Sequence, residues 1–179
     1  MAVTPPANRL WWNEPIHAIE LGWIVIAFLW GLVMFFTMVY WHSIGEQNLA
    51  NETYKVVPQL YAAKAEAMTE KYTVRDEVGI PVVRPPPGSD VYLIARIWSW
   101  WPILELEKGQ SYRLHMSAME YSHGFSLQPV NINIQIQPGY EHVLTITPSQ
   151  SGKFGIVCNE FCGFGHHTMV SPLYVVDRS

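Results

Sequence analysis

Residues 91–98, VYLIARIW, alternate between two sets of side chains, with Val, Leu, Ala and Ile at the odd positions. Successive side chains of a β-strand point to opposite faces, so this period of two predicts a half-buried strand. Residues 131–136, NINIQI, repeat the pattern with isoleucine at every second position. The chain from residue 91 onward therefore predicts a β domain.

Shorter runs of the same kind fill the rest of residues 91–179, separated by the turn sequences EKGQ, QPGY and TPSQSGK. About seven strands in roughly 90 residues are typical of a small antiparallel sandwich or Greek-key barrel. The fold class is therefore expected to be mainly β. The further predicted strands are 111–118, 121–127, 142–147, 153–157 and 170–176.

Residues 21–42 are almost wholly apolar, and no Asp, Glu, Lys or Arg occurs from Leu21 to Gly45. At about 1.5 Å per residue such a segment spans about 30 Å as a helix, which matches the hydrocarbon layer of a membrane. A cleaved signal peptide is the alternative, but its apolar core is usually about 7–15 residues and ends in small residues. We therefore expect one retained transmembrane helix after an N-terminal segment of residues 1–20. The expected interfacial aromatic residues are Trp11, Trp12, Tyr40 and Trp41.

A polar connector, residues 43–90, separates this helix from the β domain. Within it, PQLYAAKAEAMTEKY predicts a solvated helix from Pro58, with Leu60 and Met68 on one face. The proline-rich RPPPGS at 84–89 ends regular structure and marks the domain boundary.

The formal net charge of -4 argues against a nucleic-acid partner, which would require a basic surface. Acidic and basic side chains nearly balance in residues 91–179. A protein partner is therefore not expected to be attracted by a strong field of one sign.

Residues 155–170, GIVCNEFCGFGHHTMV, contain the chain's two cysteines together with histidine and methionine. A disulfide between Cys158 and Cys162 would close a very short loop and leave His166 and Met169 without a role. A zinc site would have unusual ligand spacing, and a thioether is a poor zinc ligand.

Copper fits this set of donors better, and two arrangements remain open. A single blue copper needs two histidines, one cysteine and a weak methionine ligand, which would leave one cysteine unused. A binuclear copper centre uses both thiolates as bridges, so that one electron can be shared between two metals through sulfur.

The pattern C-x-E-x-C-G-x-x-H-x-x-M, with SHGF upstream, resembles the CuA site of cytochrome c oxidase subunit II. The segment HGFSLQPVNINIQIQPG and the single anchor helix resemble the B-type (ba-type) branch of the heme-copper oxidases. This resemblance implies a cupredoxin-like domain at 91–179. It implies a ligand set of bridging Cys158 and Cys162, terminal His123 and His166, weakly bound Met169, and the backbone carbonyl of Glu160.

The remaining candidate residues follow from the same resemblance. In the mitochondrial-type branch the carboxylate at Glu160 reaches a magnesium ion at the contact with subunit I. An aromatic segment in the position of Trp98 and Trp100 receives electrons from the donor. His167 matches no position of the pattern. We expect His115 and His142 to be ordinary surface or edge histidines.

The resemblance implies the electron-entry subunit of a membrane oxidase. A c-type cytochrome would deliver electrons to the copper centre, and heme in subunit I would receive them for reduction of dioxygen to water. The C-terminal domain would then lie on the periplasmic or extracellular side of the cell membrane. Two alternatives are the CuA subunit of a nitric oxide reductase and a membrane-tethered copper carrier or chaperone.

Overall fold

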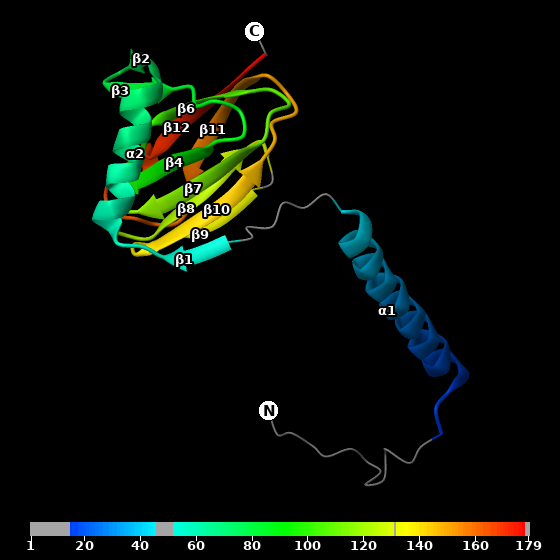
Figure 1. Cartoon of the computed structure of the whole chain (residues 1–179). Coiled ribbons are helices and arrows are strands. Elements are labelled where there is room, and N and C mark those ends of the chain that lie inside the picture. Colours follow the sequence, from blue (N-terminus) through cyan, green and yellow to red (C-terminus); the bar gives the residue numbers. More distant parts are fainter. Residues whose placement is uncertain (1–14, 46–51, 131, 178–179) are drawn as a thin grey trace, which may run out of the picture. The chain divides into compact units, whose positions relative to one another are not determined.

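The computed structural model describes residues 15–45, 52–130 and 132–177, and divides the chain into two compact units with a boundary after Gln47. In the described part of the first unit, residues Ala18–Ile44 form one helix, α1 (Figure 1). The helix begins where the backbone N–H of His17 donates to the Glu20 carboxylate at 2.9 Å. At about 1.5 Å per residue it is about 40 Å long, enough by length and composition to cross a membrane. The predicted apolar helix is confirmed, while Trp11 and Trp12 lie outside the described residues.

The second unit contains two β-sheets built from twelve strands in its described residues. The five-stranded sheet has the order β1-β10-β7-β4-β5, and the seven-stranded sheet has the order β2-β3-β6-β12-β11-β8-β9. The strands are β1 (Glu52–Lys55), β2 (Thr73–Glu77), β3 (Ile80–Val83), β4 (Asp90–Arg96), β5 (Ser99–Trp101), β6 (Ile103–Glu107), β7 (Tyr112–Ala118), β8 (His123–Gln128), β9 (Ile132–Ile136), β10 (Tyr140–Ile146), β11 (Gly152–Cys158) and β12 (Val170–Val176).

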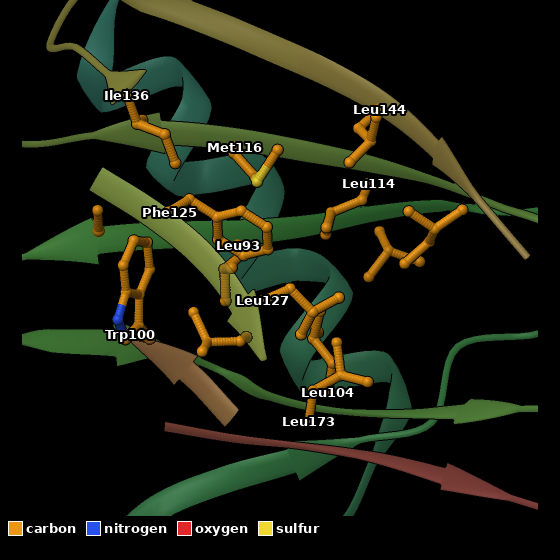
Figure 2. Packing of buried hydrophobic residues seen from close by; sticks show 14 of the residues in the cluster. Leu93, Trp100, Leu104, Leu114, Met116, Phe125, Leu127, Ile136, Leu144 and Leu173 are labelled. Atoms are coloured by element: carbon orange, nitrogen blue, oxygen red, sulfur yellow. The ribbon is translucent and has the colours of Figure 1, made fainter. Parts of the chain in front are cut away.

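One hydrophobic core lies between these sheets (Figure 2). Leu93 and Leu114 come from the five-stranded sheet, and Leu104, Phe125 and Leu173 come from the seven-stranded sheet, each at most 2% exposed. Two sheets that bury one face each against the other form a β-sandwich, so the mainly β prediction is confirmed. The sheets are mixed and not purely antiparallel, since β4 pairs with β7 and β6 pairs with β12 in parallel.

Helix α2 (Pro58–Tyr72) covers the outer face of β4. Because neighbouring side chains of a strand point to opposite faces, Leu93 enters the sandwich core while Ile94 packs with Tyr61 and Ala65 of α2. The predicted helix is present, but the face assigned to it is only partly right, since Met68 is 6% exposed whereas Leu60 is 64% exposed. The bulky Tyr61 is fully buried in its place.

The expected polar connector is largely built into the β unit. Strand β1 pairs with β10, β2 pairs with β3, and β3 pairs with β6. The compact β unit therefore includes the described strands from Glu52 onward and does not begin at residue 91. Strands β5 and β6 were also not predicted, because the aromatic run at 98–101 and the buried glutamate of β6 interrupt a simple alternation.

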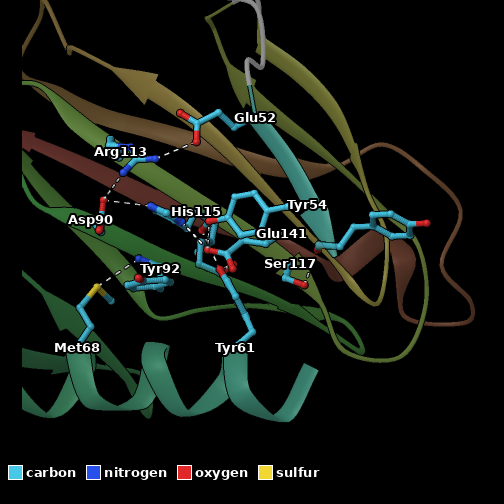
Figure 3. Close-up of polar contacts among 12 residues, drawn as sticks. Glu52, Tyr54, Tyr61, Met68, Asp90, Tyr92, Arg113, His115, Ser117 and Glu141 are labelled. Atoms are coloured by element: carbon cyan, nitrogen blue, oxygen red, sulfur yellow. Dashed lines mark hydrogen bonds and ion pairs between the residues drawn. The ribbon is translucent and has the colours of Figure 1, made fainter. Parts of the chain in front are cut away.

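A buried polar cluster joins β1, β10, β7 and β4 (Figure 3). His115 is 3% exposed and its strand β7 lies between β10 and β4, so its expected place at the surface or at a sheet edge is wrong. Its Nδ1 lies 2.5 Å from the fully buried Glu141 carboxylate, and its Nε2 lies 3.1 Å from Asp90. Tyr54 donates to the same Glu141 oxygen at 3.0 Å, and burial followed by this carboxylate raises the pKa of Tyr54 to about 12. These polar contacts tie the first strand to the sandwich.

Candidate metal centre

The cysteine-containing loop connects two neighbouring strands of the seven-stranded sheet (Figure 1). Strand β11 ends at Cys158, and β12 begins at Val170. The loop contains one short 3-10 turn, His166–Thr168, and its base is closed by the Cys158 N–H donating to the Met169 carbonyl at 3.0 Å. We call residues 159–169 the metal loop.

Strand β8 brings His123 to the start of this loop. Because β8 pairs with β11, Phe125 stands opposite Cys158, and His123 begins the same strand two residues earlier. The ladder therefore joins residues that lie 35 positions apart in the sequence, and the His123 Nδ1 lies 3.8 Å from the Cys158 Sγ.

The two thiols lie side by side, and each faces a different imidazole. The Sγ atoms of Cys158 and Cys162 are 3.7 Å apart, and the His166 Nδ1 is 3.6 Å from the Cys162 Sγ. A disulfide bond would require about 2.05 Å, and both cysteines are free. The Met169 Sδ lies 3.8 Å from Cys162, and the Glu160 carbonyl oxygen lies 3.2 Å from Cys158.

The donor atoms are mostly shielded from water. His123 and Met169 are fully buried, Cys158 is 4% exposed and Cys162 is 5% exposed. Burial, followed by the neighbouring Cys158, raises the pKa of Cys162 to about 11. Burial and then the nearby His166 lower the pKa of His123. Without a metal Cys162 therefore favours the protonated thiol and His123 favours the neutral imidazole, and metal binding must displace the proton of the Cys162 thiol.

This donor set fits copper. Two thiols, a thioether and two imidazoles are soft or intermediate ligands, which favour copper over magnesium, calcium or manganese. His123, Cys158 and Cys162 already have donor atoms within 4.8 Å of one another. The thioether of Met169 beside them argues against a structural zinc site.

The other predicted residues differ in how exposed their side chains are. His167 is exposed, and the Glu160 side chain is also exposed, so neither has its side chain buried in the cluster. Trp98 is 39% exposed, and its indole N–H donates to the Cys162 carbonyl at 3.3 Å. Trp100 is only 1% exposed and packs edge-to-face against His123. Only Trp98 of the two tryptophans can therefore reach an external partner.

Gly124 and Asn159 are two further residues that shape the site, and sequence analysis missed them. A Cβ on Gly124 would lie 2.0 Å from the Asn159 side-chain oxygen and 2.8 Å from the Glu160 backbone nitrogen. Asn159 donates from its side chain to Asn133 at 3.1 Å and from its backbone to Gly124 at 3.2 Å. The signal in the sequence was the glycine that follows His123. Because it has no side chain, the metal loop can approach the β8 backbone closely at this point.

Comparisons with known proteins support a family assignment. No protein-family model matches the chain. A cytochrome c oxidase subunit 2 of Thermus thermophilus is 30% identical over 135 residues, covering 72% of this chain and 97% of the relative. The chain belongs to the cytochrome c oxidase subunit 2 family. A second subunit 2 of Thermus thermophilus is 28% identical over 170 residues, covering 91% of this chain and 95% of the relative.

Solved structures support the fold of this subunit 2 protein. A chain in the cryo-EM structure of a heme-copper terminal oxidase dimer has a TM-score of 0.56 at 20% identity, covering 89% of this chain and all of that chain. Rusticyanin from Thiobacillus ferrooxidans has a TM-score of 0.51 at 14% identity, covering 72% and 99%. The cupredoxin-like expectation is confirmed, and as a subunit 2 the chain is a component of an oxidoreductase complex. The assignment to the B-type branch stays a prediction.

Proposed function

We propose that this chain is the electron-entry subunit of a membrane cytochrome c oxidase and that Cys158 and Cys162 bridge two copper ions. The observation that carries the proposal is the pairing of the donors. The two sulfurs are 3.7 Å apart, and each has an imidazole nitrogen of its own, at 3.8 Å and 3.6 Å. A site for one blue copper would leave one of these thiols without a function.

In this proposal His123 and His166 are the terminal ligands. Met169 is the weak ligand of one copper, and the Glu160 carbonyl is the weak ligand of the other. When bound, the binuclear copper supplies one-electron transfer with little change in bond length, because the electron is shared through sulfur.

The protein's own contribution is to hold these ligands still and to exclude water. His123 and Cys158 stand on paired strands, and His123, Met169 and Cys158 are at most 4% exposed. Ligands fixed before electron transfer need little reorganisation, because preorganised groups do not move when the charge changes. Trp98 links the surface to the site through its contact with the Cys162 carbonyl.

The copper proposal is tested on the full chain, purified in detergent and loaded with copper. We expect two copper ions per chain and a mixed-valence signal shared by two nuclei. Cys158→Ser and Cys162→Ser should each abolish the signal, whereas His167→Ala, which changes an exposed neighbouring imidazole, should retain it. One labile copper per chain would contradict the proposal and favour the copper-carrier alternative.

A donor such as a c-type cytochrome would dock on an apolar surface around the metal loop. Phe164 is 95% exposed and Phe161 is 78% exposed. Trp98 is 39% exposed, and its indole lies against Gly163 and Gly165 of the same loop. Charge screening acts on ion pairs and not on apolar burial, so the reduction rate should depend weakly on salt. Phe164→Ser should slow stopped-flow reduction by the donor and leave the copper spectrum unchanged. A steep fall of the wild-type rate with added salt would contradict this surface.

The membrane arrangement follows from the same function. Helix α1 is the membrane anchor in this proposal, and an external electron donor requires the β unit on the periplasmic or extracellular side. Protease added to intact spheroplasts should then remove the β unit. Its full protection would reverse the orientation.

The partner that receives electrons would be subunit I, whose heme site reduces dioxygen to water. The exposed Glu160 carboxylate is available to bind a magnesium ion at that contact. Glu160→Gln should lower the magnesium content of the assembled complex and leave copper in place, because only the Glu160 backbone carbonyl faces Cys158.

A further inference from the structure

Trp98 has an unusual backbone conformation for its residue type. It occupies the second position of the two-residue turn between β4 and β5, where Arg96 pairs with Ser99. Its φ is 66°, in the left-handed region that turns normally give to glycine or asparagine. A bulky side chain is disfavoured there, so the surrounding contacts must hold it in place.

The indole of Trp98 lies directly against the backbone of the metal loop. Its N–H donates to the Cys162 carbonyl at 3.3 Å, and its Nε1 would lie 3.5 Å from a Cβ built on Gly163. A Cβ on Gly165 would lie only 2.2 Å from the indole Cδ2. The ring therefore covers the segment that joins Cys162 to His166.

The two glycines under the ring serve different purposes. Gly163 has a φ of 110°, a backbone conformation that residues with a Cβ atom rarely adopt. Gly165 has φ -88° and ψ 10°, which other residues can adopt. Gly165 is therefore a glycine because the indole leaves no room for a side chain, and this makes the contact testable.

We propose that Trp98 is a positioning residue of the metal centre, in addition to any contact with a donor. Its indole holds the segment from Cys162 to Gly165 in place before metal enters, and so sets the positions of Cys162 and His166. The consequence for copper rests on the proposed function. The ordering of the loop concerns the metal-free chain and can be measured independently of it.

The first test measures amide hydrogen exchange of residues 162–168 in the copper-free full chain in detergent. Trp98→Phe keeps an aromatic ring but removes the N–H, and should speed exchange about three- to tenfold, the equivalent of one hydrogen bond. Trp98→Ala should speed it further. Ile97→Ala, the matched control in the same turn, should leave it unchanged. Exchange within β7 (Tyr112–Ala118) reports whether each variant still folds.

A double-mutant cycle separates direct contact from general destabilisation. Gly165→Ala should speed loop exchange in the wild-type background, because its methyl group must displace the indole. The same change should add little in the Trp98→Ala background, where the obstructing ring is gone. Additive effects of the two substitutions would overturn the proposal, as would unchanged exchange in Trp98→Ala.

The copper-loaded chain supplies a spectroscopic readout. Trp98→Phe should shift the thiolate-to-copper absorption bands and speed copper loss to a chelator, while Ile97→Ala should do neither. Unchanged absorption bands and an unchanged rate of copper loss in Trp98→Phe would overturn the proposed effect of Trp98 on the copper centre. A wild-type chain that binds no copper while its loop exchange still depends on Trp98 would refute the proposed function and leave the positioning role intact.

Discussion

The two halves of the candidate metal centre are held in different ways. His123 and Cys158 stand on β8 and β11, where strand pairing fixes their backbones, and both are buried. Cys162 and His166 stand on a loop, where the contacts of Trp98 and a short 3-10 turn replace a ladder. The first half therefore belongs to the sandwich itself, whereas the second is added to it by local contacts.

The largest expected difference in stability between the two halves is the one between alanine substitutions of the two proposed terminal histidines. His123→Ala removes a fully buried ring that packs against Trp100, and should lower the copper-free unfolding free energy by about 2–4 kcal/mol. His166→Ala removes a partly exposed ring from the loop and should cost about 0.5 kcal/mol or less. Both should impair copper binding. Denaturant unfolding of the copper-free full chain measures the difference, and equal losses would contradict the division into two halves.

A change in the sheet away from the metal loop should reduce stability without loosening the loop. Glu105 of β6 accepts from Arg84 Nε at 2.7 Å and also pairs with Arg75. Burial alone would raise the pKa of Glu105, but hydrogen bonds and charges from the two arginines outweigh it and lower this pKa. Glu105→Gln should cost about 1.5–3 kcal/mol at neutral pH, the range for hydrogen bonds to a charged group.

The pH dependence of that loss has a defined sign. Because the folded pKa of Glu105 is lowered, the stabilisation is present above the unfolded pKa of about 4.3 and is lost as the pH falls through the folded pKa. The difference between wild type and Glu105→Gln should therefore shrink below about pH 4. Unfolding curves across this range measure it, with loop hydrogen exchange as the control. A stability difference between wild type and Glu105→Gln that grows on acidification would refute the lowered folded-state pKa of Glu105.

A small effect on the fold is also expected at Met169, where the loop meets β12. Met169→Leu nearly conserves side-chain volume at a fully buried position and should cost about 1 kcal/mol or less. As the proposed weak ligand, its sulfur tunes the potential more than it retains the metal, so copper should stay bound and its reduction potential should shift. Copper analysis and redox titration test both points. Loss of copper as complete as in His123→Ala would reject the ranking of ligands.

Much of the fold followed from local sequence patterns. Each of these patterns repeats within one short segment, so periodicity predicts the apolar run of α1, the helix from Pro58 and the alternation of β4 and β9. The face of α2 did not follow, because burial of Tyr61 depends on contacts with β4, which a helical pattern alone does not contain. His115 was likewise misplaced, since only strand pairing brings Glu141 to its Nδ1.

The candidate site divides in the same manner. The spacing of Cys158, Cys162, His166 and Met169 was sufficient to predict a soft-metal loop and, by resemblance, its family, because these donors lie within twelve residues of chain. Only the tertiary structure decided which imidazole faces which sulfur and that Trp100 is buried while Trp98 covers the loop. Those facts depend on the pairing of β8 with β11 and on the turn between β4 and β5, which is far from the metal loop in the sequence. Long-range contacts of this kind produce no periodic pattern in the sequence, so a local pattern cannot predict them.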